Sequence, residues 1–258
     1  MTSKNFNDAA KLVWQYYKEV RKGDSVIRSG FGLYGAYPYV PNEIPFNRPE
    51  SVSEHTRGMI ELIFGINRYF PEIFKTEELV RAIRVAHYHD LGENELGDLP
   101  DDGSYDRKTK DFIEYQHVLS CSEAWPDRLE FMTDYVAFQF PESSTLSKEQ
   151  RLFAENLRLC DKLDAVLKGL FYELRGVKGS MEMRKKRYGV LYEREIRLAK
   201  EIGTDGMSDI WAAYFIEAHQ HFQNFPLFLK ILRAAVVDVR GADFSWLEKK
   251  LTSWLSSL

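Results

Sequence analysis

The chain has 258 residues, 44% of them hydrophobic and 29% charged, with a formal net charge of -4 at pH 7. This is the composition of an ordinary globular protein, and it gives no overall attraction to nucleic acid or to an anionic membrane surface. The first ten residues lack the apolar stretch of a signal peptide, no apolar run approaches the ~20 residues of a membrane span, and the two cysteines form no metal or redox motif. We therefore expect a cytoplasmic protein.

Apolar side chains recur every three or four residues along most of the chain, which is typical of amphipathic helices. In chain order the pattern predicts helices over residues 8–22, 55–70, 77–90, 108–124, 128–138, 147–174, 181–202, 209–240 and 245–255. No segment worth assigning as a strand alternates polar and apolar residues. The sequence therefore predicts an all-α protein, with residues 1–258 in a single domain.

Residues 27–49 interrupt this pattern with three glycines, four prolines and five aromatic side chains. Such a density of helix breakers predicts an irregular segment, and a loop of this length is more often functional than idle. Its aromatic side chains can equally serve to pack the loop onto the body of the protein. Both interpretations stay open.

His89 and Asp90 stand together at the end of one predicted helix. An imidazole beside a carboxylate can bind a divalent cation, although a histidine hydrogen-bonded near a helix end is a common alternative. Glu93 lies four residues after His89, and Asp98 follows in a glycine-containing loop. Four acidic or imidazole groups within ten residues are costly unless a cation or water organises them. The sequence therefore favours a metal site at this helix end.

Two further candidate ligands, His55 and Asp161, lie far away in the sequence. Asp161 has apolar neighbours on its own side of the long predicted helix, so a buried carboxylate there needs a partner such as a metal. The alternative is a surface charge stripe shared with Asp164 and Lys168. Two imidazole nitrogens and two carboxylate oxygens together suit a first-row divalent metal better than calcium.

The order His…His-Asp…Asp resembles the HD-domain metal-dependent phosphohydrolases, and in particular the branch of the bacterial 5'-deoxynucleotidase and its HD-domain relatives. The runs that carry this likeness are Arg28-Ser29-Gly30-Phe31, Arg48-Pro49-Glu50-Ser51-Val52-Ser53-Glu54-His55, His89-Asp90-Leu91-Gly92-Glu93-Asn94-Glu95-Leu96-Gly97-Asp98-Leu99-Pro100 and Leu159-Cys160-Asp161-Lys162-Leu163. The likeness covers about residues 27–174. Residues 175–258 lie beyond it, as additional C-terminal helices.

The resemblance implies an HD-domain helical bundle that holds one divalent transition metal on His55, His89, Asp90 and Asp161. Manganese, cobalt, zinc, iron and nickel are not distinguished by these ligands. In such enzymes the metal binds a phosphate oxygen and lowers the pKa of a bound water.

The resemblance also assigns roles around the metal. Glu93 would orient or deprotonate the water, Asp98 would assist at the leaving oxygen or the sugar, and Arg28 would hold the phosphate. Where the deoxynucleotidase has a tryptophan that excludes a 2'-hydroxyl, this chain offers Ser29 or, two positions on, Phe31, and these residues would line the substrate. The loop over residues 30–47 is longer than in those relatives, and the preference for deoxyribose stays open.

The expected function is therefore a metal-dependent phosphohydrolase that releases phosphate from a nucleoside 5'-monophosphate or a similar small ester. No nucleic-acid or membrane partner is expected, and the C-terminal helices either close over the pocket or form a homodimer. Two alternatives stay open. One is an HD hydrolase of a larger nucleotide, a phosphodiester or a phosphonate, and the other is a nucleotide-binding sensor without turnover.

Overall fold

The computed structural model of the protein describes residues 7–11, 13–14, 52–91, 107–123, 125–174, 180–181, 193–241 and 246–257. Its helices are α2 (Val52–Tyr69), α3 (Thr76–Tyr88), α5 (Arg107–Cys121), α6 (Arg128–Gln139), α7 (Lys148–Leu174), α9 (Glu193–Ile202), α10 (Met207–His219), α11 (Phe225–Arg240) and α12 (Trp246–Ser256), and residues 7–11 and 13–14 are also helical. Over these ranges no strand is present, apart from one isolated β-bridge between Ser180 and Gly206. The predicted all-α class is confirmed.

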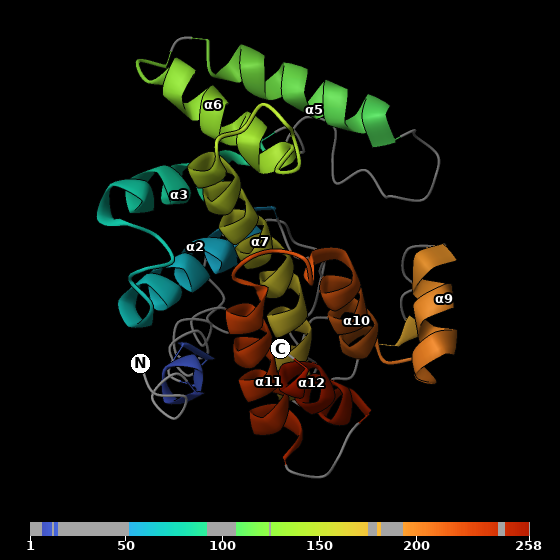
Figure 1. Ribbon diagram of the computed structural model, residues 1–258. Coiled ribbons are helices and arrows are strands. Elements are labelled where there is room, and N and C mark those ends of the chain that lie inside the picture. The colour runs from blue at the N-terminus through green and yellow to red at the C-terminus, as the bar shows by residue number, and fades with distance from the viewer. Residues whose placement is uncertain are drawn as a thin grey trace, which may run out of the picture.

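The long helix α7 is the central element. It packs against α2, α3 and α6 and also against α10 and α11 (Figure 1). Apolar side chains on two sides of α7 are fully buried, among them Leu157, Leu163 and Leu170. A helix covered on two sides can present a polar side chain to the interior of the molecule, and this is the setting of Asp161.

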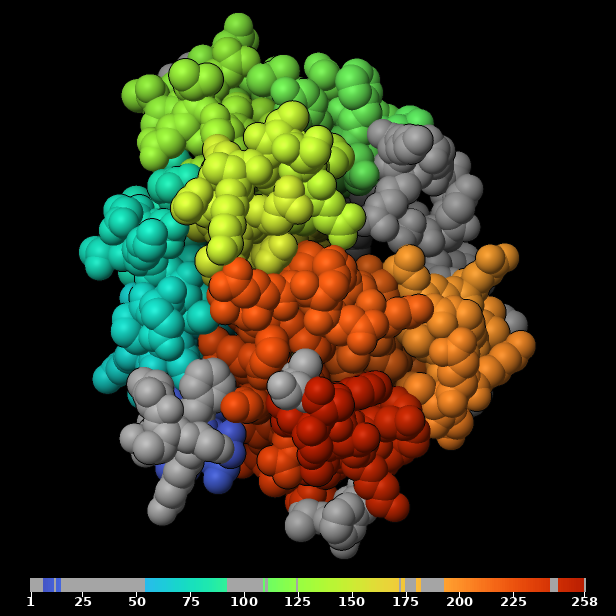
Figure 2. Space-filling view, viewed as in Figure 1, coloured from blue at the N-terminus to red at the C-terminus, as the bar shows by residue number. Residues whose placement is uncertain are grey.

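The C-terminal helices belong to the same core as the motif-bearing helices. One cluster of buried apolar residues contains Ile66 of α2, Val85 of α3, Leu163 of α7, Phe215 of α10 and Phe228 of α11. Figure 2 shows the C-terminal helices, in orange and red, directly against the cyan region of α2 and α3. Among the described residues, no helix is long and apolar enough to span a membrane.

The helix predicted over residues 209–240 is two helices. α10 ends at His219, and α11 begins at Phe225 with Asn224 as its N-cap and Pro226 in its first turn. Proline has no N–H group and disrupts a helix interior, but it is tolerated in the first turn, where that N–H has no partner. Of the helix predicted over residues 181–202, the structure describes residue 181 and α9.

Helices α5 and α6 form a second, smaller core at the N-terminal end of α7. Val118 of α5 is buried there with Phe131 and Tyr135 of α6. Ion pairs join α6 to α3, where Arg81 Nε donates a 2.9 Å hydrogen bond to Asp134 Oδ2. These contacts fix the C-terminal end of α3, which is where His89 and Asp90 lie.

Candidate metal centre

Three helices bring four of the predicted ligands together. His55 lies in the first turn of α2, His89 is the C-cap of α3 with Asp90 directly after it, and Asp161 lies in the middle of α7. Because α2 and α3 pack side by side and both contact α7, the start of α2 and the end of α3 meet at one point along α7.

The atoms that can bind a metal lie close to one another. One ligand atom from each of His55, His89 and Asp161 fits within a group whose members are all within 4.8 Å of one another. His55 Nε2 is 3.0 Å from Asp161 Oδ1 and 3.8 Å from Asp90 Oδ2. His89 Nε2 is 3.1 Å from Asp90 Oδ2 and 4.0 Å from Asp161 Oδ1. His55, His89 and Asp161 can therefore hold a metal ion, with Asp90 beside them.

The orientation of the His89 ring fits this use. Its Nδ1 lies 2.8 Å from the backbone oxygen of Ala86, and because a carbonyl oxygen only accepts, we assign the proton to Nδ1. The other nitrogen, Nε2, is buried and has no hydrogen-bond partner, because with the proton on Nδ1 both Nε2 and the Asp90 oxygen 3.1 Å away are acceptors. A buried nitrogen with a free lone pair is costly unless it binds a cation or a proton donor. Neutral imidazole held in this way is the usual form of a metal-binding histidine.

His55 is held by the carboxylate of Asp164, a residue that one of the two interpretations of the sequence placed on a surface stripe. Its Nδ1 is 3.0 Å from Asp164 Oδ2, which leaves Nε2 directed at Asp161. Asp161, Asp164 and Lys168 are only 4%, 0% and 7% exposed, so the surface-stripe alternative is wrong. A carboxylate behind a metal-binding histidine fixes the orientation of the ring and raises its basicity. The spacing of three residues from Asp161 was the available signal, because it places Asp164 on the same side of α7.

The electrostatics of the cluster favour ionised carboxylates around a cation. Burial opposes charge on Asp161, but the Lys162 ammonium and the hydrogen bond from His55 hold the pKa of this carboxyl well below its usual range. Burial likewise opposes charge on Asp90, and the neighbouring His89 and His55 rings hold its pKa below the ordinary value. On His55 the effect of burial is outweighed by Asp161 and Asp164, which raise its pKa well above the ordinary value. Asp161 and Asp90 can thus serve as anionic ligands.

Two cationic side chains flank the cluster on α7. Lys162 Nζ is 2.8 Å from Asp161 Oδ2, and Arg158 Nη1 is 4.0 Å from the same oxygen. The Arg158 guanidinium lies 4.8 Å from the centre of the Phe138 ring and donates a 2.9 Å hydrogen bond to the backbone oxygen of Gln139. The Lys162 side chain remains 35% exposed, so a ligand that enters from solvent can contact its ammonium group. Neither cation was assigned a role from the sequence.

The remaining predicted site residues lie outside the described part of the chain. They are Arg28, Ser29, Phe31, Glu93 and Asp98, together with the loop over residues 30–47. Their roles stay predictions of the resemblance. Because no protein-family model, no curated protein and no solved structure matches this chain, the likeness to the HD-domain phosphohydrolases rests on the motif residues themselves.

Proposed function

We propose that the protein is a metal-dependent phosphohydrolase that releases phosphate from nucleoside 5'-monophosphates or similar small phosphate esters. The observation that carries the proposal is the buried, unpartnered Nε2 of His89, which points into a group completed by His55 and Asp161. Such a set of nitrogen and carboxylate ligands suits a divalent transition ion.

Each described residue has a distinct part in this proposal. His55, His89, Asp90 and Asp161 would hold the metal, which when bound polarises a phosphate oxygen and acidifies a water. Asp164 keeps the His55 ring in the orientation that directs Nε2 at the cluster. Glu93 remains the proposed base, by the resemblance alone.

The charge beside the cluster favours a phosphate ester over a neutral substrate. The pKa of Lys162 is raised, because the Asp161 carboxylate outweighs the effect of burial, so its amine is protonated at neutral pH. A partly exposed ammonium next to a metal can compensate the negative charge of a phosphate group and the charge that develops during its transfer. The nucleoside part of the substrate is inferred only from the resemblance.

Phosphate release from a panel of ribo- and deoxyribonucleoside 5'-monophosphates tests the proposal. The protein is stripped of metal and then given manganese, cobalt, zinc or magnesium in turn. We expect turnover to return only with a metal, and the ratio of ribo- to deoxyribonucleotide turnover reports the sugar preference. Absence of release with every metal would favour a larger phosphate ester or the nucleotide sensor.

The variant Asp90→Asn tests the assigned site. We expect it to abolish metal-dependent turnover while its circular dichroism stays that of the wild type, because the change keeps shape and removes one ligand charge. Asp127→Asn is the matched control, since Asp127 is an exposed aspartate paired with Arg84 on the α3–α6 side. Activity that survives in Asp90→Asn would show that the site is assigned wrongly.

A further inference from the structure

One face of α7 beside the metal cluster is directed at α10. Lys162 and Arg158 precede Gly169 by seven and eleven residues, which is about two and three helical turns, so the three share a face. At Gly169 α10 approaches α7 closely, because a Cβ atom at that position would lie 3.3 Å from both Ser208 Cβ and the Trp211 ring.

The register between the two helices places His219 beside this face. α10 runs antiparallel to α7, with Trp211 at Gly169 and, past the end of α10, Asn224 Nδ2 donating a 2.9 Å hydrogen bond to Asn156 Oδ1. His219 lies eight residues after Trp211, and Asp161 lies eight residues before Gly169. The last residue of α10 is therefore level with the metal cluster.

The His219 ring is fixed by its own helix. Its Nδ1 lies 2.8 Å from the backbone oxygen of Phe215, which can only accept, so Nδ1 carries the proton. The ring also packs against Phe215 and Phe222, with centroid distances of 5.5 and 5.2 Å. Among the described residues, Nε2 has no hydrogen-bond partner.

The state of the ring follows from its surroundings. Burial, with the nearby charges of Lys162 and Arg158, lowers the pKa of His219 to about 4, against the backbone hydrogen bond and Asp161. At neutral pH the ring is therefore uncharged, and Nε2 presents a lone pair. This lone pair does not attract the phosphate group itself. It can accept a hydrogen bond from a hydroxyl or an N–H group on the part of the substrate that is attached to the phosphate.

We propose that His219 is a substrate-positioning residue, whose Nε2 accepts a hydrogen bond from a hydroxyl or N–H donor on the part of the substrate that extends from the phosphate along α7. This rests on the proposed function, in which the phosphate binds beside the metal cluster and Lys162. It gives the C-terminal helices a direct part in the site: α7 supplies the cations and α10 supplies the acceptor.

The test compares two substrates in each variant. One is the best nucleoside 5'-monophosphate of the panel, and the other is p-nitrophenyl phosphate, whose leaving group has no hydroxyl or N–H. His219→Asn keeps a side-chain N–H near the position of Nδ1 and loses the acceptor at Nε2. His219→Gln can place an amide oxygen near the position of Nε2.

We expect His219→Asn to lower kcat/KM for the nucleotide by roughly tenfold, mainly through KM, and to leave p-nitrophenyl phosphate within about twofold of the wild type. His219→Gln should recover part of the loss. The ratio of the two kcat/KM values does not depend on the fraction of folded enzyme, so a partly unfolded variant still gives an answer.

An unchanged ratio in His219→Asn, in an active enzyme, would overturn the role of His219 and leave the proposed function standing. A wild type that hydrolyses neither substrate with any metal would instead refute the proposed function, and this inference with it.

Discussion

The two histidines of the candidate metal centre are oriented by different means. His89 Nδ1 donates a hydrogen bond to a backbone oxygen of its own helix, whereas His55 Nδ1 contacts the carboxylate of Asp164 on α7. His89 is therefore fixed by local structure, and His55 only by tertiary packing. The orientation of His55 is the more sensitive of the two to substitution of a single distant residue.

Asp164→Asn should weaken metal binding about 10–100-fold without loss of the helical fold, because a neutral amide raises the basicity of His55 less than a carboxylate does. Titration calorimetry with zinc or manganese measures the change in Kd. Asp134→Asn is the control, as Asp134 is also a buried aspartate but pairs with Arg81 and Arg84. It should lower the free energy of unfolding and leave the Kd for metal unchanged. An unaltered Kd in Asp164→Asn would refute the positioning role.

His219 should make stability depend on pH. Its pKa is about 4 in the folded protein against 6.5 ordinarily, so between these values the unfolded chain binds more protons. The free energy of unfolding should therefore fall as pH drops from 6.5 towards 4, by roughly 3 kcal/mol at most from this residue. His55, whose pKa is raised, has the opposite sign, and its contribution is lost as pH rises above 6.5, outside this range.

The contribution of His219 is isolated by comparison with His219→Gln, which has no titrating ring. Urea denaturation at several pH values should show that the difference between wild type and variant changes across this range. A constant difference would contradict the prediction.

At the level of the helices, regular periodicity was enough to predict α2, α3, α6 and α7 to within a few residues. The break after His219 was missed because α10 and α11 are both apolar enough to read as one helix, although Pro226 was a visible signal. Packing between helices is not encoded in local periodicity. His55 and Asp161 are 106 residues apart, so their 3.0 Å contact depends on how α2 seats against α7. The ligands could be proposed from motifs. The roles of Asp164, Lys162 and His219 could be assigned only from the packing of the helices.

A largely buried ionic network joins α7 to the C-terminal helices α10 and α11. Arg240 of α11 donates 2.9 and 3.0 Å hydrogen bonds to Glu173 of α7 and a 2.6 Å hydrogen bond to Asp209 of α10. Ser208 of α10 also hydrogen-bonds Glu173. Both acids are largely buried, so they depend on Arg240 for compensation of their charge.

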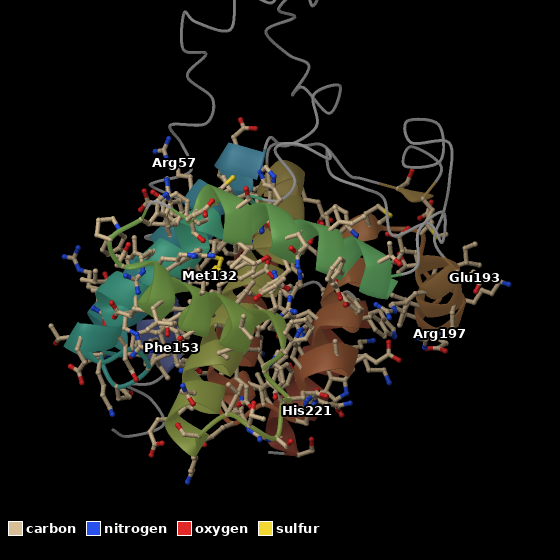
Figure 3. The ribbon with its side chains drawn as sticks, turned by 90° about the horizontal axis from the view of Figure 1, so that it is seen from above. Arg57, Met132, Phe153, Glu193, Arg197 and His221 are labelled. Atoms are coloured by element: carbon tan, nitrogen blue, oxygen red, sulfur yellow. The ribbon has the colours of Figure 1, made fainter. Side chains whose placement is uncertain are left out.

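Arg240→Met should therefore lower the free energy of unfolding by about 3–5 kcal/mol, because it leaves buried carboxylates without their cation. Arg197→Met is the matched control. Arg197 pairs with Glu217 across an exposed surface, and Figure 3 shows it at the outer edge of the molecule on α9. Its loss should cost much less than that of Arg240, because solvent screens the exposed pair. Equal losses of unfolding free energy in the two variants, measured by urea denaturation, would show that the network around Arg240 stabilises the fold no more than an exposed ion pair does.

For the whole molecule, the metal site and the core are products of the same packing. The candidate ligands come from α2, α3 and α7, and the core that holds these helices together extends through α10, α11 and α12. The unfolded chain has no means of bringing residues 55, 89 and 161 together. Metal affinity is therefore coupled to global folding, including that of the C-terminal helices.

A metal bound at this site should stabilise the entire fold. At a free concentration about 100 times its Kd, it raises the free energy of unfolding by roughly 2.7 kcal/mol, which for a chain of this size is a rise in Tm of about 5–10 °C. Differential scanning calorimetry of metal-stripped and metal-loaded protein measures the shift. Asp161→Asn should lose most of it, because the carboxylate that contacts His55 is removed. An equal shift in this variant would place the stabilising ion elsewhere and separate it from the cluster of His55, His89 and Asp161.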